Sequence, residues 1–529
     1  MNGRCVSIVY SMCQPLASPC ATSFCTYFST LMKKEKDWFK LKRYPHIGQP
    51  LKQKDRTWVT NYVTDPKCVA THRFFPFIHR STTTRKFRRV VDKRDGTRSR
   101  KRVASLKTRE LYYANHLDSC VYGYYAQLLN TRYEVEVVRH ALYEVVTAYR
   151  RIEVDPKGLN TSHKSNADFA ADVFNFILNH QSEHLVAITL DIRGFFDNLD
   201  HKLLKKAWYS LNCKPTLSES EFKIFKSITS FSFVNEKQLF KEFKTEIITE
   251  SKTGIQRKRS IKRIHHLRNQ GAVAFCECKD IKRIKSKGLL VANGIAPHEK
   301  RKVGIPQGSP ISAVLANVYM LEFDKKINTQ IENWGGLYRR YSDDMIVICD
   351  ASAQNEIIEL FTSEIASISL EIQKEKTQIF TFNKVAERFV CTQKVGVADY
   401  PHKNLEYLGF EFDGLNTYLK SSSLSSFYRK MKRSHSRSAF YSKTLLTSKS
   451  KGDIFKTRLY KRFSYKGASR KRIYKQDPSD PKKWVKTSFH NWGNYISYAN
   501  MAMNKLPNNK IKGQIKRHWK ILNKLISPS

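Results

Sequence analysis

The sequence predicts an α+β fold in which an antiparallel sheet is backed by helices and followed by a mainly helical, basic C-terminal region. Aromatic and basic residues 338–341 and apolar residues 345–349 flank two acidic residues, as in a β-hairpin. Residues 185–190 form a continuous apolar run of strand length. Other stretches, such as residues 168–178 and 511–526, repeat apolar residues at helical spacing.

The composition indicates a nucleic-acid partner. The 529 residues include 94 Lys and Arg against 47 Asp and Glu, which gives a formal net charge of +47. Positive charge of this size attracts polyanions. Apolar residues make up 41 % of the chain, yet no apolar run reaches the ~20 residues that cross a bilayer. We therefore expect a cytoplasmic protein of two or three subdomains without a membrane partner.

The first 31 residues differ from the rest of the chain. They contain four of the 11 cysteines and a single basic residue, Arg4, but no acid. Pro15 and Pro19 interrupt any secretory segment, and one Arg is few for a transit peptide. We expect residues 1–31 to be an extension or a disordered tail, with Met32 as the natural start.

The cysteines form no repeated Cys-x-x-Cys pair, so neither a disulfide framework nor a standard zinc finger is indicated. A zinc site is the alternative that the sequence leaves open, with the ligands His265, His266, Cys276 and Cys278.

Residues 32–147 form a basic and aromatic N-terminal region. Residues 106–148 repeat apolar and tyrosine residues at helical spacing, so we expect a helical region whose tyrosines belong to the core.

Three aspartates lie at the ends of predicted strands. Asp191 ends the run of residues 185–190, and Asp343 and Asp344 form the tip of the predicted hairpin. Two adjacent Asp residues mean little alone, because Asp is a common turn residue. A third carboxylate at the end of a neighbouring strand favours a metal-binding role. A two-metal site holds ions about 4 Å apart and needs carboxylates from more than one strand. Mg²⁺ prefers such hard oxygen ligands.

Three stretches in this order, residues 191–201, 304–312 and 338–349, resemble the palm of a reverse transcriptase. The resemblance implies a right-hand polymerase, with fingers and palm over residues 148–410 and a thumb over residues 411–529. A basic insertion separates the first two stretches, at about residues 211–303. Residues 252–287 of it hold twelve Lys and Arg, which are either a solvated face or a grip on template or structured RNA.

The resemblance also implies roles for single residues. Asp191, Asp343 and Asp344 would bind two Mg²⁺ or Mn²⁺ ions, with help from the Ile192 carbonyl. The Phe196 ring would leave no room for a ribose 2′-hydroxyl and so select deoxynucleotides. Three further residues complete the nucleotide and primer contacts: Gln307 and Gly308 at the templating pair and Tyr341 at the primer terminus.

Cations complete the implied site. Lys376, with Lys374 as its rival, would protonate or steady the leaving pyrophosphate. The triphosphate would meet a cation from the fingers, and a surface role is equally open for each candidate: Arg150, Arg151, Lys157 and Lys164. Residues 405–410 resemble the hairpin that grips the primer. In the predicted thumb, basic and aromatic residues alternate, as suits single strands or duplex ends; residues 484–505 and 511–526 are expected to be helical.

The sequence thus predicts an RNA-directed DNA polymerase with an RNA template, a DNA product and deoxynucleoside triphosphates as partners. Among reverse transcriptases, the sequence is most similar to the bacterial defence-associated group, which is related to retron and group II intron enzymes. This implies a dedicated noncoding RNA and anti-phage defence. The alternative is a maturase-like RNA-binding or splicing protein with little polymerisation. An oligomer is not excluded.

Overall fold

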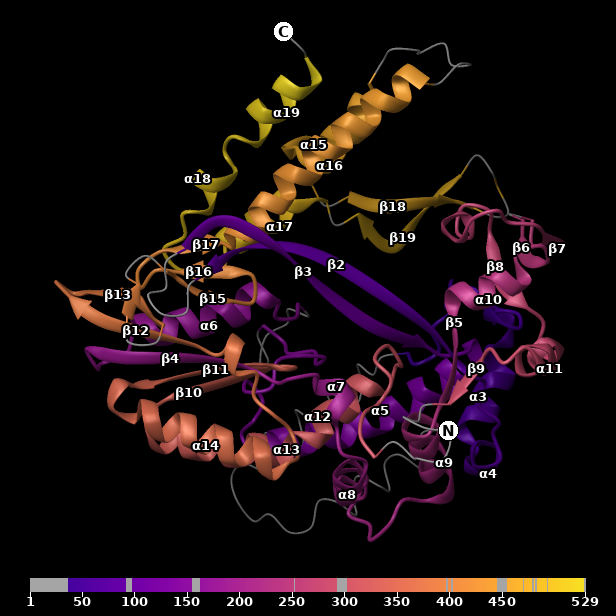
Figure 1. Ribbon diagram of the computed structural model, residues 1–529, viewed down its shortest axis with the longest axis horizontal. Coiled ribbons are helices and arrows are strands. Elements are labelled where there is room, and N and C mark those ends of the chain that lie inside the picture. Colours follow the sequence, from indigo (N-terminus) through magenta and orange to yellow (C-terminus); the bar gives the residue numbers. More distant parts are fainter. Residues whose placement is uncertain are drawn as a thin grey trace.

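The computed structural model has the expected mixture of helices and sheets (Figure 1). It describes residues 37–91, 98–154, 162–251, 253–292, 302–395, 398–400, 403–444, 454–469, 471–477, 480, 483–491 and 493–527. The prediction for residues 1–31 therefore lies outside the described residues. No helix among those described is long and apolar enough to cross a membrane.

A six-stranded central sheet organises the fold, and all of its neighbouring strands are antiparallel. The predicted apolar strand is β4 (His184–Asp191), near the middle of the sheet. The order is β10 (Leu337–Tyr341), β11 (Asp344–Asp350), β4, β12 (Gln378–Val385), β13 (Arg388–Val395) and β14 (Ala398–Tyr400).

Both faces of this sheet are buried at β4 and β11, which explains the nearly continuous apolar runs of these two strands. Val186 and Ile188 of β4 belong to one core, whereas Leu185 and Ala187 belong to a second core on the opposite face. Strand β11 divides in the same way, because successive side chains of a strand point to opposite faces.

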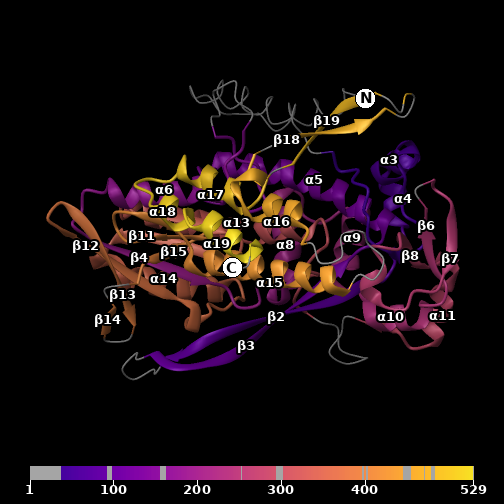
Figure 2. The same cartoon turned by 90° about the horizontal axis from the view of Figure 1, so that it is seen from above.

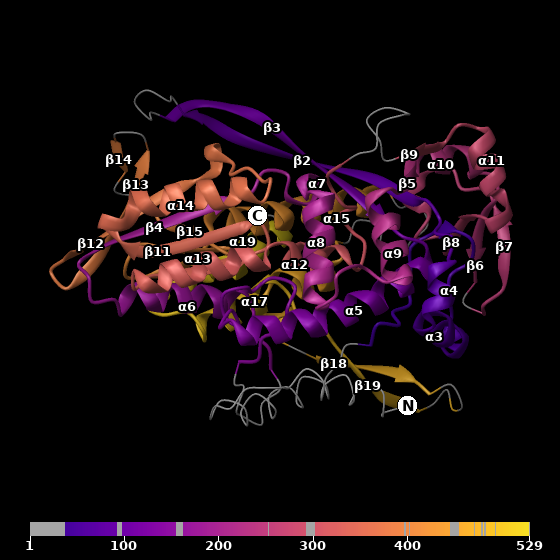
Figure 3. The same ribbon diagram turned by 90° about the horizontal axis from the view of Figure 1, so that it is seen from below.

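Helices cover the first face, and α13 and α14 lie below the sheet in Figure 1. That core includes residues of α5 (His116–Arg139), α8 (His201–Leu211), α12 (Ser312–Tyr319), α13 (Leu321–Asn333) and α14 (Gln354–Ser367). The second core includes residues of α6 (Asn166–Leu178) and of the C-terminal region. Figure 3 shows α13, α14 and α8 from below.

A long basic ribbon dominates the N-terminal region, after β1 (His46–Ile47), α3 (Arg56–Thr64) and α4 (Pro66–Ala70). Strands β2 (Phe77–Val91) and β3 (Arg98–Tyr113) form it, and it runs along one long side of the molecule (Figures 2 and 3). The predicted helix over residues 106–148 is therefore wrong up to Tyr113, correct over His116–Arg139 and wrong again over residues 140–148, which form turns and a β-bridge. Pairing with β2 decides the first part. The tyrosines of α5 include core residues, as predicted.

The basic insertion folds around a small core that it shares with Ile47 and Ile78 of the N-terminal region, at the right-hand end of Figure 1. After α9 (Glu219–Thr229) come β5 (Ser232–Asn235), α10 (Glu236–Phe243), β6 (Ile247–Glu250), β7 (Gln256–Arg259), β8 (Ala272–Cys276), α11 (Ile281–Ser286) and β9 (Leu290–Ala292). Strands β1, β8, β6 and β7 form a sheet in this order, so β7 lies at an edge.

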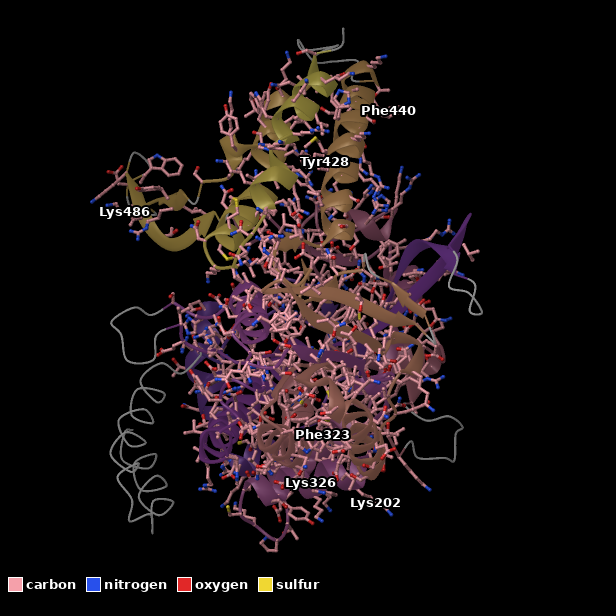
Figure 4. The ribbon with its side chains drawn as sticks, turned by 90° about the vertical axis from the view of Figure 1, so that its left-hand side faces the viewer. Lys202, Phe323, Lys326, Tyr428, Phe440 and Lys486 are labelled. Atoms are coloured by element: carbon pink, nitrogen blue, oxygen red, sulfur yellow. The ribbon has the colours of Figure 1, made fainter. Side chains whose placement is uncertain are left out.

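The C-terminal region begins with a three-stranded sheet of β15 (Leu405–Tyr407), β16 (Phe410–Phe412) and β17 (Thr417–Leu419). Helices α15 (Ser421–Thr444), α16 (Lys456–Phe463), α17 (Tyr495–Met503), α18 (Ile511–Ile515) and α19 (His518–Ile526) follow. The predicted helix over residues 484–505 is wrong in its first part. There β19 (Trp484–Asn491) pairs with β18 (Lys471–Gln476), and this hairpin projects beside the helices, with Lys486 on it (Figure 4).

Candidate active site

Two of the three predicted aspartates lie at the tip of the hairpin β10–β11, as expected. Tyr341 pairs with Asp344, so Ser342 and Asp343 form a two-residue turn. Ser342 has φ +63°, the left-handed conformation that such tight hairpins require. Its hydroxyl also lies 3.0 Å from that of Tyr149. The strand pairing and the contact with Tyr149 therefore both hold the turn that carries Asp343.

Asp191 lies directly opposite Asp344. The register of β11 against β4 pairs these two residues, so both side chains point to the same face of the sheet. Asp343 is held close by, because its carbonyl accepts a hydrogen bond of 3.2 Å from the Ile192 amide. Like charges at directly opposed positions are unfavourable in a sheet. The arrangement therefore suits a ligand with positive charge.

The electrostatic cost appears in Asp344. Desolvation by the surrounding strands, followed by the charges of Asp343 and Asp191, raises the pKa of this carboxyl to about 6. Lys376 opposes this increase. Perturbed carboxylates of this kind are typical of functional sites, although they also occur in structural networks.

Lys376 is the cation that reaches the aspartates. Its Nζ lies 2.7 Å from Oδ1 of Asp191, and the two side chains are 41 % and 17 % exposed. The turn of residues Lys374–Lys376 is placed there because the Gln373 amide donates a 2.8 Å hydrogen bond to the Asp191 carbonyl. Of the two lysines that the sequence left open, Lys376 makes this contact.

The chemistry of the three carboxylates fits Mg²⁺ or Mn²⁺, which prefer oxygen ligands. Over the described ranges, however, no three His, Cys, Asp or Glu side chains converge closely enough to hold a metal ion. The same result leaves the zinc alternative of the insertion without support: Cys276 is buried and Cys278 exposed.

A buried ion pair supports the hairpin from below, and sequence reasoning missed it. Arg340 of β10 and Asp324 of α13 are both fully buried, with Nη2 and Oδ2 2.5 Å apart. Tyr338 donates a 2.9 Å hydrogen bond to Asp324, and Arg340 donates bonds of 3.2 Å to Asn317 and to the Ser342 carbonyl. Strand alternation gives a signal, because Arg340 shares the face of Tyr338 and would need a buried partner there.

The second stretch of the resemblance lies against the first. The Ile305 amide donates a 2.8 Å bond to the Phe196 carbonyl, and the Gly304 amide donates one of 2.8 Å to Leu199. Phe195 of α7 (Phe195–Asn198) is buried in the core, whereas Phe196 is only partly buried. The sugar-selecting role of Phe196 remains a prediction.

Gly308 has a backbone neighbour in the structure that the sequence did not predict. Its φ is +117°, and a Cβ there would lie 2.7 Å from the carbonyl oxygen of Tyr112. The Tyr112 amide in turn donates a 2.8 Å bond to the Gln307 carbonyl. This glycine therefore permits the close approach of strand β3, and its expected contact with template and nucleotide remains a prediction. The following helix, α12, begins at Ser312.

Two of the four predicted triphosphate-binding cations are paired with acidic residues of the protein. Arg150 is 1 % exposed and donates to both carboxylate oxygens of Glu134, which makes it a structural residue and corrects that expectation. Lys164 lies 2.9 Å from both Glu144 and Asp172. Arg151 is exposed, and Lys157 lies outside the described residues.

The predicted primer hairpin is present as β15–β16. Leu408 and Gly409 form its turn, and both have positive φ, at +44° and +97°. This is the backbone that a two-residue hairpin turn of the I′ class requires. Tyr341 is half-buried at the end of β10. The expected contacts of both features with a primer remain predictions.

A cationic hollow of about 330 Å³ lies between α15 and α16. Aromatic Tyr441 and Phe455 line it together with five cations, and all of these residues come from the basic and aromatic segment of the sequence: Lys430, Arg433, Arg437, Arg458 and Arg462. Cations beside aromatic rings suit phosphates and unstacked bases.

Comparison with known proteins agrees with this geometry. Residues 272–412 match the family described as reverse transcriptase (RNA-dependent DNA polymerase), a range that includes the aspartate hairpin but not Asp191. No curated protein matches the chain. The chain is similar to telomerase from Candida tropicalis truncated from its C-terminal domain (13 % identity, 59 % of this chain, 52 % of that chain, TM-score 0.34). It is also similar to Candida albicans telomerase in complex with a telomeric RNA fragment (14 %, 77 %, 58 %, 0.35).

The chain spans little more than half the length of these telomerases, and scores this low carry no argument about fold or function. The family match stands by itself and supports RNA-directed DNA polymerase activity. The chain contains a reverse transcriptase domain, which includes residues 272–412.

Proposed function

We propose that this protein is an RNA-directed DNA polymerase that extends a 3′-hydroxyl with deoxynucleotides. One observation carries the proposal: Asp191 and Asp344 face each other across β4 and β11, with Asp343 in the adjoining turn. The family match over residues 272–412 supports it independently.

In this proposal Asp191, Asp343 and Asp344 hold two Mg²⁺ ions, with Mn²⁺ as a substitute. Bound there, the ions supply charge stabilisation for the attacking and leaving oxygens. Lys376, already in contact with Asp191, steadies or protonates the pyrophosphate. Arg340 acts indirectly, because it holds the turn that presents Asp343.

The right-hand architecture belongs to the same proposal. The central sheet is the palm, the β2–β3 ribbon belongs to the fingers, and the C-terminal helices with their cationic hollow form the thumb. The Phe196 ring selects the sugar, Gln307 contacts the templating pair and Tyr341 supports the primer end. Substitution of Phe196 by Ala should therefore lower discrimination against ribonucleotides by at least about tenfold, measured as the ratio of kcat/KM values.

The narrower proposal is a dedicated noncoding RNA template in anti-phage defence, in the cytoplasm. This proposal is supported by stretches such as Arg73–Phe77, which resemble sequences of the defence-associated group. Sequencing of nucleic acids that co-purify with the protein tests it. One abundant RNA with complementary DNA is the expected result, and a diverse mixture of cellular RNAs would contradict a dedicated template.

Primer extension on a primed RNA tests the activity itself. Wild-type protein should incorporate deoxynucleotides only with Mg²⁺ or Mn²⁺, and the double variant Asp343→Asn/Asp344→Asn should not, while it binds RNA nearly as before. A matched control is Asp350→Asn, at the opposite end of β11, which should retain synthesis. Synthesis by the double variant would refute the assignment. RNA binding without synthesis in the wild type would favour the maturase-like alternative.

A further inference from the structure

The basic insertion carries a row of exposed cations that the proposed catalytic site does not use. Residues 256–268 contain no acid. Within them five cations are exposed and have no acidic partner among the residues that the structure describes. We call this row the basic edge: Arg257, Arg259, Lys262, Arg263 and Arg268.

The acids of the same subdomain are all committed to other groups. Glu242 and Glu246 bind Arg283, and Glu277 binds Lys258 and Lys279. The remaining three acids of residues 236–287 also have partners: Glu236 with Tyr113 and Arg80, Glu250 with Lys52 and Gln256, and Asp280 with the Glu277 amide. Internal pairing therefore leaves the positive charge of the basic edge uncompensated.

Strand geometry sorts these cations. Residues 256–259 form β7, the edge strand of its sheet, and pair only with β6 among the described strands. Gln256 and Lys258 point to the face where Glu250 and Glu277 bind them. Arg257 and Arg259 point to the other face, and the repeat of an antiparallel strand places their Cα atoms about 6.8 Å apart. Neither guanidinium group has an acidic partner in the part of the chain that the structure describes.

Protection of a sheet edge does not account for the whole row. Proteins place Lys or Arg on edge strands to prevent pairing with other chains, and Arg257 and Arg259 alone would satisfy this need. Lys262, Arg263 and Arg268, however, follow the strand, in the turn and 3-10 segment where there is no edge to protect. What these three residues share with Arg257 and Arg259 is a positive charge on an exposed side chain.

We propose that the basic edge binds the phosphate backbone of RNA outside the carboxylate site. Planar guanidinium groups suit phosphate, and neutralised phosphates provide most sequence-independent affinity for nucleic acid. The insertion lies at the opposite end of the molecule from β12 and β13 (Figure 1). The basic edge therefore contacts RNA that extends beyond a short primed duplex. The choice of RNA as the polyanion rests on the proposed function.

The test compares two triple variants of the full chain. Arg257→Gln/Arg259→Gln/Arg263→Gln removes charge from the basic edge. The control removes three exposed lysines from α8 and α9, one of which, Lys202, lies far from the C-terminal helices in Figure 4: Lys202→Gln, Lys206→Gln and Lys226→Gln. The probe is a long RNA hairpin without nucleotides or Mg²⁺, so binding is measured separately from polymerisation.

The edge variant should bind this RNA at least tenfold more weakly at low salt. The negative slope of log K against log salt should become shallower by about 2 to 3, near one unit for each lost phosphate contact. The control should change affinity less than twofold, and both variants should extend a short primed RNA at the wild-type rate. Cross-linking of photoreactive RNA to the wild-type protein should label residues 253–268, which gives a result independent of any variant's folding.

Unchanged affinity and slope in the edge variant would overturn the proposal, as would an equal loss in the control. Equal competition by polyglutamate would also overturn it, because the basic edge would then bind any polyanion and not RNA in particular. If the wild type fails to polymerise but the edge variant loses RNA binding, the proposed function fails and this inference stands.

Discussion

The aspartate site and the basic edge treat charge in opposite ways. At the aspartate site three carboxylates lie together, and Lys376 contacts one of them. Among residues 236–287 of the insertion every acid has a partner, whereas the five cations of the basic edge have no acidic partner among the described residues. Marginal stability makes uncompensated charge costly to keep. We infer from the contrast that each region is built for a ligand of the opposite sign, and the following predictions test that contrast.

The largest effect should come from Arg340, because the aspartate site rests on a buried ion pair and the basic edge does not. Arg340→Met would leave Asp324 charged and buried, which typically costs about 3–5 kcal/mol of unfolding free energy. Urea unfolding measures this loss. The double variant Arg340→Met/Asp324→Leu should recover part of it. A loss below about 1 kcal/mol for Arg340→Met would show that the pair does not support the hairpin.

Removal of Lys376 should have the next largest effect. Lys376→Met takes away the ammonium group that lowers the pKa of Asp344, so this pKa should rise above about 6. Because the ions need an ionised carboxylate, the midpoint of Mg²⁺ binding and of activity should move to higher pH. We also expect kcat to fall by about 10²-fold through loss of leaving-group stabilisation. Lys374→Met serves as the matched control and should leave both the midpoint and kcat unchanged.

Asp344→Asn should stabilise the metal-free protein. The folded-state pKa of about 6 exceeds the usual value of 3.8, so ionisation of Asp344 lowers stability as pH rises between these values. Asp344 is an exposed residue, so solvent screens the charges, and the gain at pH 7 should be only about 1 kcal/mol. Thermal unfolding in EDTA at pH 7 and at pH 4 measures it. The gain should disappear at the lower pH; an equal gain at both would exclude charge repulsion.

The smallest effect should come from Lys258→Gln. Lys258 is on the same strand as Arg257 but is paired with Glu277, with side chains 51 % and 33 % exposed. Such surface pairs are worth about 0.5 kcal/mol or less. Neither unfolding free energy nor the salt slope of RNA binding should change appreciably, whereas Arg257→Gln should lower the slope by about one. Equal slopes for the two variants would show that exposure and pairing do not distinguish these cations.

The sequence was sufficient where local pattern decides the structure. The run of residues 185–190 ends at Asp191, and alternation in β11 places Asp344 on the matching face. It failed where a distant partner decides. Arg150 and Lys164 resemble free cations until the fold supplies Glu134, Glu144 and Asp172. Residues 106–113 have helical spacing, yet cross-strand pairing with β2 makes them a strand.

The backbone contact between β3 and the loop at Gln307 links two distant parts of the protein mechanically. Tyr112 bonds Gln307 and leaves no room for a Cβ at Gly308, so neither segment moves far without the other. The β2–β3 ribbon extends from this contact along the side of the molecule (Figure 3). Nucleic acid that displaces the ribbon would therefore also displace Gln307, the residue expected to contact the templating base.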